Sequence, residues 1–294
     1  MKTPFFTGAC TALVTPFYNG SLNLPMLEQL LYRQMDAGIS AVVLCGTTGE
    51  SPTLSDDEKL TMFRCGKEIT GSNSKIIAGT GSNDTGHAIA LSQAAEETGV
   101  DGLLIVTPYY NKATPDGLIA HYAAIAASVK IPIILYNVPS RTGVDIPISV
   151  YEALSQIPNI VGVKEASTDI IKIAKIKAAC PPDFAVWSGN DEMAVPVMSL
   201  GGAGVISVAS NVTPIQVQAM AEAALAGDFD SAAALQLDLM PLISLLFCEV
   251  NPIPVKAAMK LLGHDCGECR MPLTPLTPDH HKKLQACLSS KFLS

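Results

Sequence analysis

The hydrophobic residues of the chain fall into short runs separated by longer amphipathic stretches. Each run has four to six residues and is rich in Val, Ile and Leu, which is typical of parallel strands covered on both faces. The eight predicted strands are 9–14, 41–44, 75–78, 102–106, 133–136, 160–163, 184–187 and 204–208. The predicted helices between them include 24–37, 55–70, 85–98, 114–129 and 168–179.

Boundary signals support the helical interpretation of these stretches. Ser55 is followed by Glu58 three residues later, which is a capping-box pattern at the start of a helix. Gly38 and Gly99 each follow a predicted helix. Glycine is the residue type that most often ends a helix, because it tolerates a left-handed backbone.

The alternation of strand and helix predicts a parallel sheet. Eight such units can close into a (β/α)8 barrel, a fold that takes about 250 residues, and this chain has 294. An open doubly wound sheet would carry a glycine-rich fingerprint after its first strand. Residues 15–17 read Thr-Pro-Phe instead, so we predict the α/β TIM barrel.

The strand pattern stops after about residue 225. The segments 228–246, 254–262 and 277–288 have helical patterns, and no low-complexity linker precedes them. We therefore predict a catalytic barrel over residues 1–224 and a C-terminal helical region over residues 225–294 that packs on the barrel.

The charge of the chain narrows the classes of partner. Its net charge is −8 and no basic block is present, which argues against nucleic acid and against an anionic membrane surface. The first residues lack the apolar run of a signal peptide, and we see no run of about 18 apolar residues that would span a membrane. We expect a cytoplasmic protein with reduced cysteines.

One cysteine pair has the spacing of a metal or redox motif. Cys266 and Cys269 form a CxxC pattern, but a zinc site needs a second pair of ligands at suitable spacing, and none follows. We expect both cysteines to lie in a surface loop. The five histidines are dispersed, so we predict no metal and no cofactor.

Polar and glycine-rich segments follow the predicted strands, where barrel enzymes place their active sites. Segment 46–50 (GTTGE) offers hydroxyls and amides, or is an ordinary turn. Segment 107–111 (TPYYN) offers phenols, or two aromatics that cover a hydrophobic edge. Segment 136–143 (YNVPSRTG) pairs Tyr136 with Arg141, whose fork matches a carboxylate unless it is a surface arginine.

Lys164 directly follows the apolar run of the sixth strand. Burial disfavours the charged form of an amine, and a neutral amine attacks carbonyl carbons. The alternative is a lysine that extends to the rim or pairs with a carboxylate. Glycine loops near residues 188–191 and 201–207 leave a phosphorylated-sugar aldolase open.

Together, the segments 46–50, 136–143 and 162–165 (GVKE), in this order and spacing, resemble the 4-hydroxy-tetrahydrodipicolinate synthase (dihydrodipicolinate synthase) family. The similarity extends from Gly8 through Pro275. Neighbouring families, the N-acetylneuraminate lyases and keto-deoxy-sugar-acid aldolases, share the lysine and the tyrosine of strand five. The double threonine and Arg141 favour the synthase.

The resemblance implies a lyase that condenses pyruvate with aspartate 4-semialdehyde through a Schiff base on Lys164. It implies that Tyr136, Thr47 and Tyr110 relay protons, with Tyr110 supplied by a neighbouring subunit of a homotetramer. It also implies that Thr48 binds the pyruvate carboxylate and Arg141 the semialdehyde carboxylate. The carbonyl groups of two further residues would line the site: Gly189 and Ile206.

Some members of the family are inhibited by lysine at a site between subunits. The resemblance places that site at Ser51, Pro52, Asp56, Lys59, Asn83, His87 and Tyr109. His87 stands where a glutamate is expected and Lys59 where a histidine is common. Because a lysine ammonium requires a carboxylate partner, we expect weak or absent inhibition by lysine.

Two alternatives remain at this point. One is a lyase or aldolase that acts on sialic acid or sugar acids, whose polyol substrate would require hydroxyl partners in place of Arg141. The other is a catalytically inactive barrel with a binding role, which the presence of Lys164, Tyr136, Thr47 and Tyr110 disfavours.

Overall fold

The computed structural model describes residues 4–291 and has a closed barrel of eight parallel strands at its centre. Neighbouring strands follow chain order, and β1 closes the barrel by pairing with both β4 and β10. The barrel strands are β1 (Gly8–Ala12), β4 (Ala41–Leu44), β5 (Lys75–Gly79), β6 (Gly102–Val106), β7 (Ile133–Asn137), β8 (Ile160–Glu165), β9 (Ala185–Ser188) and β10 (Gly204–Ser207). The predicted barrel is confirmed.

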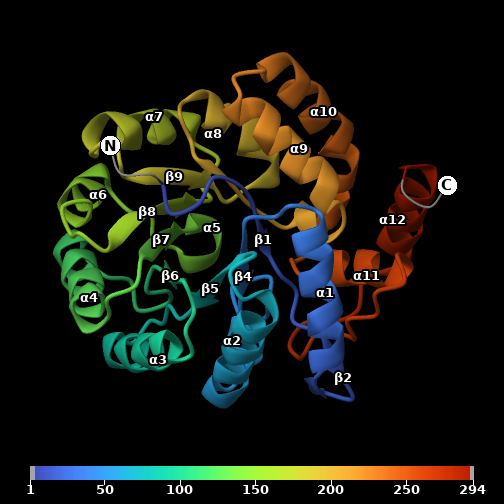
Figure 1. Cartoon of the computed structure of the whole chain (residues 1–294), viewed down its shortest axis with the longest axis horizontal. Coiled ribbons are helices and arrows are strands. Elements are labelled where there is room, and N and C mark those ends of the chain that lie inside the picture. Colours follow the sequence, from blue (N-terminus) through green and yellow to red (C-terminus); the bar gives the residue numbers. More distant parts are fainter. Residues whose placement is uncertain (1–3, 292–294) are drawn as a thin grey trace.

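Helices surround the barrel, and Figure 1 shows them as an outer ring. The longer ones between strands are α1 (Leu24–Asp36), α2 (Asp56–Thr70), α3 (Thr85–Glu97), α4 (Pro115–Ser128), α7 (Ile170–Ala179) and α9 (Pro214–Leu225). Shorter elements are α5 (Pro139–Thr142), α6 (Ile148–Leu154), α8 (Ala194–Ser199) and the 3-10 turns η1 (Ser51–Thr53), η2 (Asp191–Met193) and η3 (Ala209–Asn211). The capping box at Ser55 and Glu58 is present.

A small hairpin follows the first barrel strand and was not predicted. It pairs β2 (Phe17–Tyr18) with β3 (Ser21–Leu22). The two residues between them, Asn19 and Gly20, have φ values of 50° and 79°. Asn-Gly with positive φ at both positions is the preferred turn of a tight hairpin, so the signal was in the sequence.

Three helices form the C-terminal region: α10 (Phe229–Leu246), α11 (Ile253–Leu261) and α12 (Pro278–Lys291). They pack on one another, and α10 also packs on α9 and α8 of the barrel layer. Among the described residues α10 is long and apolar enough to cross a membrane by length and composition alone, a test that the core helix of a soluble protein also passes. The division of the chain at residue 225 stays a prediction.

The segment around the CxxC pattern differs from the expected surface loop. Cys266 is buried, and its carbonyl accepts a hydrogen bond from Phe17 N of the hairpin at 2.9 Å. Cys269 is half-buried. The expectation that both cysteines lie in a surface loop is therefore wrong for Cys266, because the unpredicted hairpin provides a surface on which this segment packs.

An aromatic pair closes the N-terminal end of the barrel. Trp187 stacks on Phe6 with a centroid separation of 4.7 Å. Gly162 on the neighbouring strand makes room for this indole, since a Cβ there would lie 2.2 Å from Ala185 O and 2.8 Å from the Trp187 ring. The interior is thus filled at this end, as is usual for the fold.

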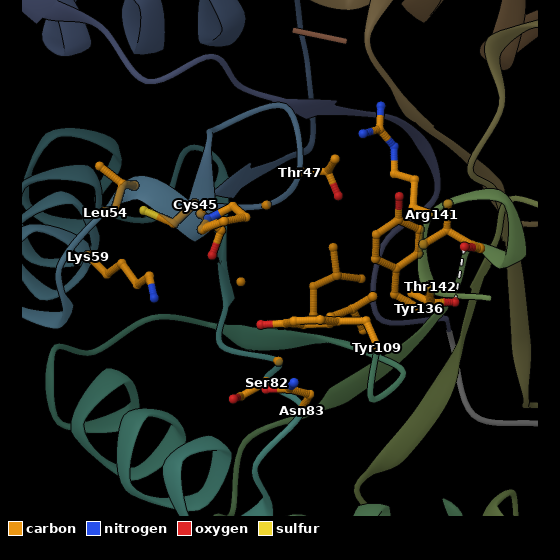
Figure 2. Close-up of a pocket in the computed structure, with 18 of the residues that line it drawn as sticks. Cys45, Thr47, Leu54, Lys59, Ser82, Asn83, Tyr109, Tyr136, Arg141 and Thr142 are labelled. Atoms are coloured by element: carbon orange, nitrogen blue, oxygen red, sulfur yellow. Dashed lines mark hydrogen bonds between the residues drawn. The ribbon is translucent and has the colours of Figure 1, made fainter. Parts of the chain in front are cut away.

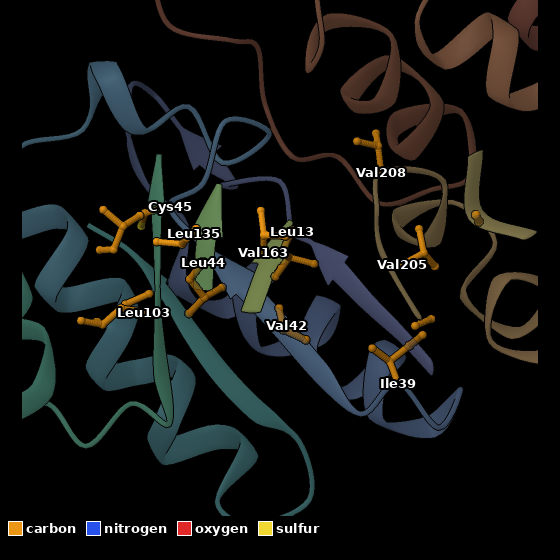
Figure 3. Packing of buried hydrophobic residues seen from close by; sticks show 14 of the residues in the cluster. Leu13, Ile39, Val42, Leu44, Cys45, Leu103, Leu135, Val163, Val205 and Val208 are labelled. Carbon is orange, nitrogen blue, oxygen red and sulfur yellow. The ribbon is translucent and has the colours of Figure 1, made fainter. Parts of the chain in front are cut away.

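The pairing of β7 with β8 contains a register shift. Ile160 lies opposite Ile133, but the next pair is Gly162 with Ile134. Ile160 packs outward against the helices, in the same hydrophobic cluster as Leu135 and Val163, which Figure 3 shows. Strict alternation from this residue would turn Lys164 outward too, because side chains alternate with a period of two. The one-residue shift instead directs Lys164 into the barrel.

Candidate active site

A cavity of about 670 Å³ opens where the loops follow β4, β5, β6 and β7. These loops leave the C-terminal ends of the strands, which is the catalytic end of this fold. Figure 2 shows Tyr136 and Arg141 on one side of the cavity and the Lys59 amine pointing into it from the other. Thr47 lies between these two sides, with its hydroxyl directed towards the centre of the cavity.

Lys164 and Tyr136 form a pair on adjacent strands. They lie directly opposite one another in the register of β7 and β8. Lys164 is 5% exposed, and its Nζ lies 4.4 Å from the centre of the Tyr136 ring. The lysine therefore does not extend to the rim. Its amine is enclosed beside a phenol, an arrangement suited to attack on a carbonyl followed by proton transfer.

Two acidic groups near Lys164 are held in different ways. Burial raises the pKa of the Cys10 thiol, so this group stays neutral. Burial also raises the pKa of Asp191, opposed by hydrogen bonds from Ser207, Val208 and Ala209 and by the charge of Lys164. Asp191 thus interacts electrostatically with Lys164, and a positive charge on an imine formed there would favour the ionised form of this buried acid.

The same carboxylate bears on the phosphorylated-sugar alternative. Asp191 Oδ2 accepts hydrogen bonds from the amides of Val208 and Ala209 at 2.9 and 3.2 Å. These amides follow the last barrel strand, where the fold often binds phosphate. Because a carboxylate already occupies them and would repel a phosphate, the site does not favour phosphorylated substrates.

Segment 46–50 is tied to the C-terminal region. The Thr48 hydroxyl accepts a hydrogen bond from Asn251 Nδ2 at 3.0 Å. The Glu50 carboxylate accepts hydrogen bonds from Lys256 Nζ and from the amide of Arg270, both at 2.8 Å. Lys256 and Glu50 are both buried. A buried ion pair with further hydrogen bonds fixes the geometry of the loop that presents Thr47.

Arg141 lies on the short helix α5 at the side of the cavity (Figure 2). Its Nη2 donates to Asn251 O at 3.2 Å. Asn251 therefore contacts both Thr48 and Arg141, although it lies far from both in the sequence. Arg141 as a residue is exposed, and its guanidinium lines the cavity wall and is suited to bind a carboxylate that enters the cavity.

The residues predicted for a lysine site line the same cavity as Thr47. His87 Nε2 lies 2.8 Å from Asp56 Oδ2, and Lys59 Nζ lies 3.4 Å from Asp56 Oδ1. Burial tends to raise the pKa of Asp56, but the hydrogen bond and charge of His87 and the charge of Lys59 outweigh this effect. The pKa of Asp56 is therefore lowered. Further members of the predicted set that line the cavity are Ser51, Pro52, Asn83 and Tyr109.

Five predicted residues are not among those that line this cavity: Lys164 and Thr48, described above, and Tyr110, Gly189 and Ile206. Tyr110 is 92% exposed and has a φ of 69°; within one chain it does not join Tyr136. Gly189 follows β9, and its amide donates to Glu165 O at 2.7 Å. Ile206 is buried in the middle of β10.

Comparison of the sequence with models of known protein families shows to which family the chain belongs. The model of the dihydrodipicolinate synthetase family matches residues 5–291, almost the whole chain. The chain belongs to this family.

Relatives of the family cover the chain at full length. The 4-hydroxy-tetrahydrodipicolinate synthase of Acetivibrio thermocellus is 46% identical over 288 residues, covering 98% of each chain. The solved structure of the chloride-inhibited enzyme from Acinetobacter baumannii complexed with pyruvate has a TM-score of 0.94 at 41% identity, covering 97% of this chain and 98% of that one. The enzyme from Cyanidioschyzon merolae with lysine bound has a TM-score of 0.95 at 39% identity, covering 98% and 99%.

Several site residues were missed from the sequence. Asn251 lies between α10 and α11, and Lys256 lies on α11. No strand ends there, so the sequence pattern gave no reason to place either residue at the site. Asp191 was visible in segment 188–191 but carried no assigned role. Among the residues that the structure describes, no group of three or more His, Cys, Asp or Glu side chains could hold a metal ion.

Proposed function

We propose that this protein condenses pyruvate with L-aspartate 4-semialdehyde to give 4-hydroxy-tetrahydrodipicolinate, a step towards diaminopimelate and lysine. The observation that carries the proposal is the enclosed amine of Lys164 over the Tyr136 ring. The name of the Acetivibrio thermocellus relative and the pyruvate in the Acinetobacter baumannii structure support the substrates.

The reaction begins with the Lys164 amine. It attacks the ketone carbon of pyruvate, and loss of water gives a protonated imine. This imine withdraws electrons from the methyl group, which loses a proton to form an enamine. The positive charge of the imine favours the ionised form of the buried Asp191. The enamine carbon then attacks the aldehyde carbon of the second substrate, and the new alkoxide takes up a proton.

Ring closure completes the cycle. The amino group of the former semialdehyde attacks the imine carbon and displaces the Lys164 amine. These steps move protons several times within an enclosed site, which a chain of hydroxyl groups does without a metal. Thr47 and Tyr136 belong to that chain of hydroxyl groups. Tyr110 does not line the cavity of its own subunit, so Tyr110 of a neighbouring subunit completes the chain.

Two carboxylates are bound at separate places. Thr48 and the amides of segment 46–50 hold the pyruvate carboxylate, and the carbonyls of Gly189 and Ile206 line the site. Arg141, at the side of the cavity and oriented by Asn251 O, binds the semialdehyde carboxylate. A second substrate that is a polyol would leave this guanidinium without a partner.

Replacing Arg141 with alanine is expected to raise the KM for the semialdehyde by about 10–100-fold, the scale of a hydrogen bond to a charged group. The KM for pyruvate should change far less, because Thr48 binds that substrate. Steady-state kinetics with each substrate varied in turn measure both constants. The exposed Arg64 of α2 is the control, and its alanine variant should match the parent. Equal effects on both substrates would contradict the assigned role.

The choice of aldehyde tests the proposed reaction itself. The purified protein is incubated with pyruvate and either aspartate 4-semialdehyde or a series of sugar aldehydes, and products are identified by mass spectrometry. We expect the cyclic product with the semialdehyde and no condensation with the sugars. Faster condensation with a sugar aldehyde would assign the chain to the sugar-acid aldolases instead.

The lysine site is expected to respond weakly to L-lysine. Among the described residues that line the cavity, Asp56 is the only carboxylate that could hold the ammonium of a bound lysine. It is already paired with His87 and Lys59. Lys59 also places a positive charge where a cationic ligand would bind. Initial rates should therefore fall little or not at all with added L-lysine, and inhibition at sub-millimolar concentrations would contradict this assignment. The His87→Glu and Lys59→His variant should gain sensitivity.

The assembly and the location follow from the same assignment. A homotetramer built from two dimers brings Tyr110 of one subunit to the cavity of its partner. An enzyme that uses these soluble intermediates works in the cytoplasm.

A further inference from the structure

Two polar side chains lie on the outer side of the barrel wall, directly behind the catalytic pair. Asn137 follows Tyr136 in β7, and Glu165 follows Lys164 in β8. Successive side chains of a strand point to opposite faces, so these two point away from the cavity. They are 0% and 1% exposed. A buried carboxylate and amide are costly unless their hydrogen bonds are made.

Both groups are well provided with partners. Asn137 Nδ2 donates to Glu165 Oε1 and Oε2 at 2.8 and 3.0 Å. Glu165 also accepts from the Tyr151 hydroxyl at 2.7 Å and from Ser167 N at 2.8 Å. Ile146 N donates to Asn137 Oδ1 at 3.1 Å. The orientation of the amide is therefore fixed, and the carboxylate is held from three sides.

One cation lies close to Glu165. Lys172 Nζ lies 3.9 Å from Glu165 Oε2 and also pairs with Asp145. Burial and the neighbouring charge of Glu165 raise the pKa of Tyr151 well above its ordinary value, so this phenol remains a donor. The network thus contains two carboxylates, Glu165 and Asp145, which both accept from Asn137 Nδ2 and share one cation, Lys172. A buried carboxylate requires such donors and a paired cation.

The position of this pair along the strands gives it significance. The register of β7 and β8 shifts by one residue at Ile133 and Ile134, and that shift is what directs Lys164 inward. Beyond the shift, Tyr136 lies opposite Lys164 and Asn137 opposite Glu165. Beyond this bulge, a slip of one residue between the strands would turn every side chain to the other face and take Lys164 away from Tyr136.

We propose that the Asn137–Glu165 pair is a positioning device that locks β7 and β8 in the register in which the Lys164 amine lies over the Tyr136 phenol. The inference rests on the roles proposed above for Lys164 and Tyr136. Asn137 and Glu165 act through these two residues, from behind the wall of the site, and touch neither substrate.

The experiment uses four variants of the full chain: Glu165→Gln, Asn137→Asp, the double variant, and Tyr151→Phe as a control. The control removes a hydrogen bond to the same carboxylate but leaves the tie between strands in place. Three quantities are measured with pyruvate alone: thermal stability, the fraction of Lys164 trapped by borohydride, and the rate at which pyruvate methyl protons exchange with D2O. The exchange requires both the imine and a correctly placed proton acceptor.

Asn137→Asp places a second carboxylate against Glu165, and exchange per trapped site should fall by about 100-fold, the scale of a misplacement of about 1 Å. Glu165→Gln should lower it by about tenfold, as expected for loss of a hydrogen bond to a charged group. The double variant restores a hydrogen bond of reversed polarity between positions 137 and 165, although the carboxylate at 137 still faces Asp145, which accepts from Asn137 Nδ2 in the parent. It should therefore exchange about tenfold faster than Asn137→Asp, a coupling that a double-mutant cycle reports. Tyr151→Phe should keep the parent's exchange rate.

A purely structural role gives a different result. If Glu165→Gln and the double variant lose thermal stability while their exchange rate per trapped site matches the parent, the proposal is overturned. It is also overturned if the double variant exchanges no faster than Asn137→Asp. Failure of Asn137→Asp to fold leaves the comparison of the other two with the control intact. Absence of trapping in the parent protein would instead contradict the proposed function.

Discussion

Lys164→Met is expected to lower kcat by about 10³-fold or more, the scale on which loss of a nucleophile is felt. Methionine fills a similar space in the barrel but cannot form an imine, so every later step is lost with it. Because Lys164 is buried, replacing its amine by an apolar group should leave the melting temperature unchanged or raise it, as often happens when a functional polar group is removed. Activity assays and thermal unfolding measure both.

A lysine on the outside of the barrel provides the control for this substitution. Lys175 lies on α7 and is exposed. Lys175→Met should keep the parent's kcat, which shows that loss of a lysine as such has no effect. A Lys164→Met protein that kept more than a tenth of the parent's kcat would show that another residue carries the imine.

Tyr136→Phe is expected to lower kcat by about 10²–10⁴-fold, the usual contribution of a positioned acid or base. The ring that packs beside Lys164 is kept and only the hydroxyl is lost. Trapping of pyruvate by borohydride should therefore persist in this variant, while exchange of the methyl protons with D2O and formation of product should both fall. Separate measurement of the two steps distinguishes a failed proton relay from a failed imine.

A second buried tyrosine is the matched control. Tyr122 on α4 donates to Ile105 O at 3.2 Å in the layer between barrel and helices. Tyr122→Phe removes this hydrogen bond and should cost about 0.5–1.5 kcal/mol of stability with no change in kcat. If the Tyr136→Phe protein exchanged the methyl protons of pyruvate as fast as the parent, the proposed role of Tyr136 in proton transfer would be contradicted.

The barrel itself could be predicted because its strands carry a simple signal. All eight predicted runs lie in barrel strands, with ends displaced by a residue or two. The sixth run was predicted to end at Val163, but β8 continues through Glu165. A charged pair seemed to end the apolar run, and only the tertiary structure shows that both side chains are buried, one inside the barrel and one outside it.

The direction of Lys164 could not be obtained from periodicity. Counting by two from Ile160, which packs outward, gives an outward Lys164, and the register shift reverses this result. Such a shift depends on how β7 and β8 pair, which a single strand does not encode. The functional assignment came from the order and spacing of three segments, not from the pattern of the strand.

The C-terminal contacts to the site were also beyond the sequence pattern. Asn251 reaches Thr48 across 203 residues of chain, and Lys256 reaches Glu50 across 206. No local signal marks an asparagine between two helices as part of a site at the barrel's mouth. By contrast, the Asn19–Gly20 hairpin turn was readable from the sequence, and missing it led to the wrong expectation for Cys266.

The most direct measurement is to incubate the protein with pyruvate, reduce the mixture with borohydride, digest it and locate the adduct by mass spectrometry. The account predicts one reduced pyruvate adduct, carried by the peptide that contains Lys164, and none when borohydride is omitted. An adduct on a different lysine, or no adduct in an active preparation, would contradict it.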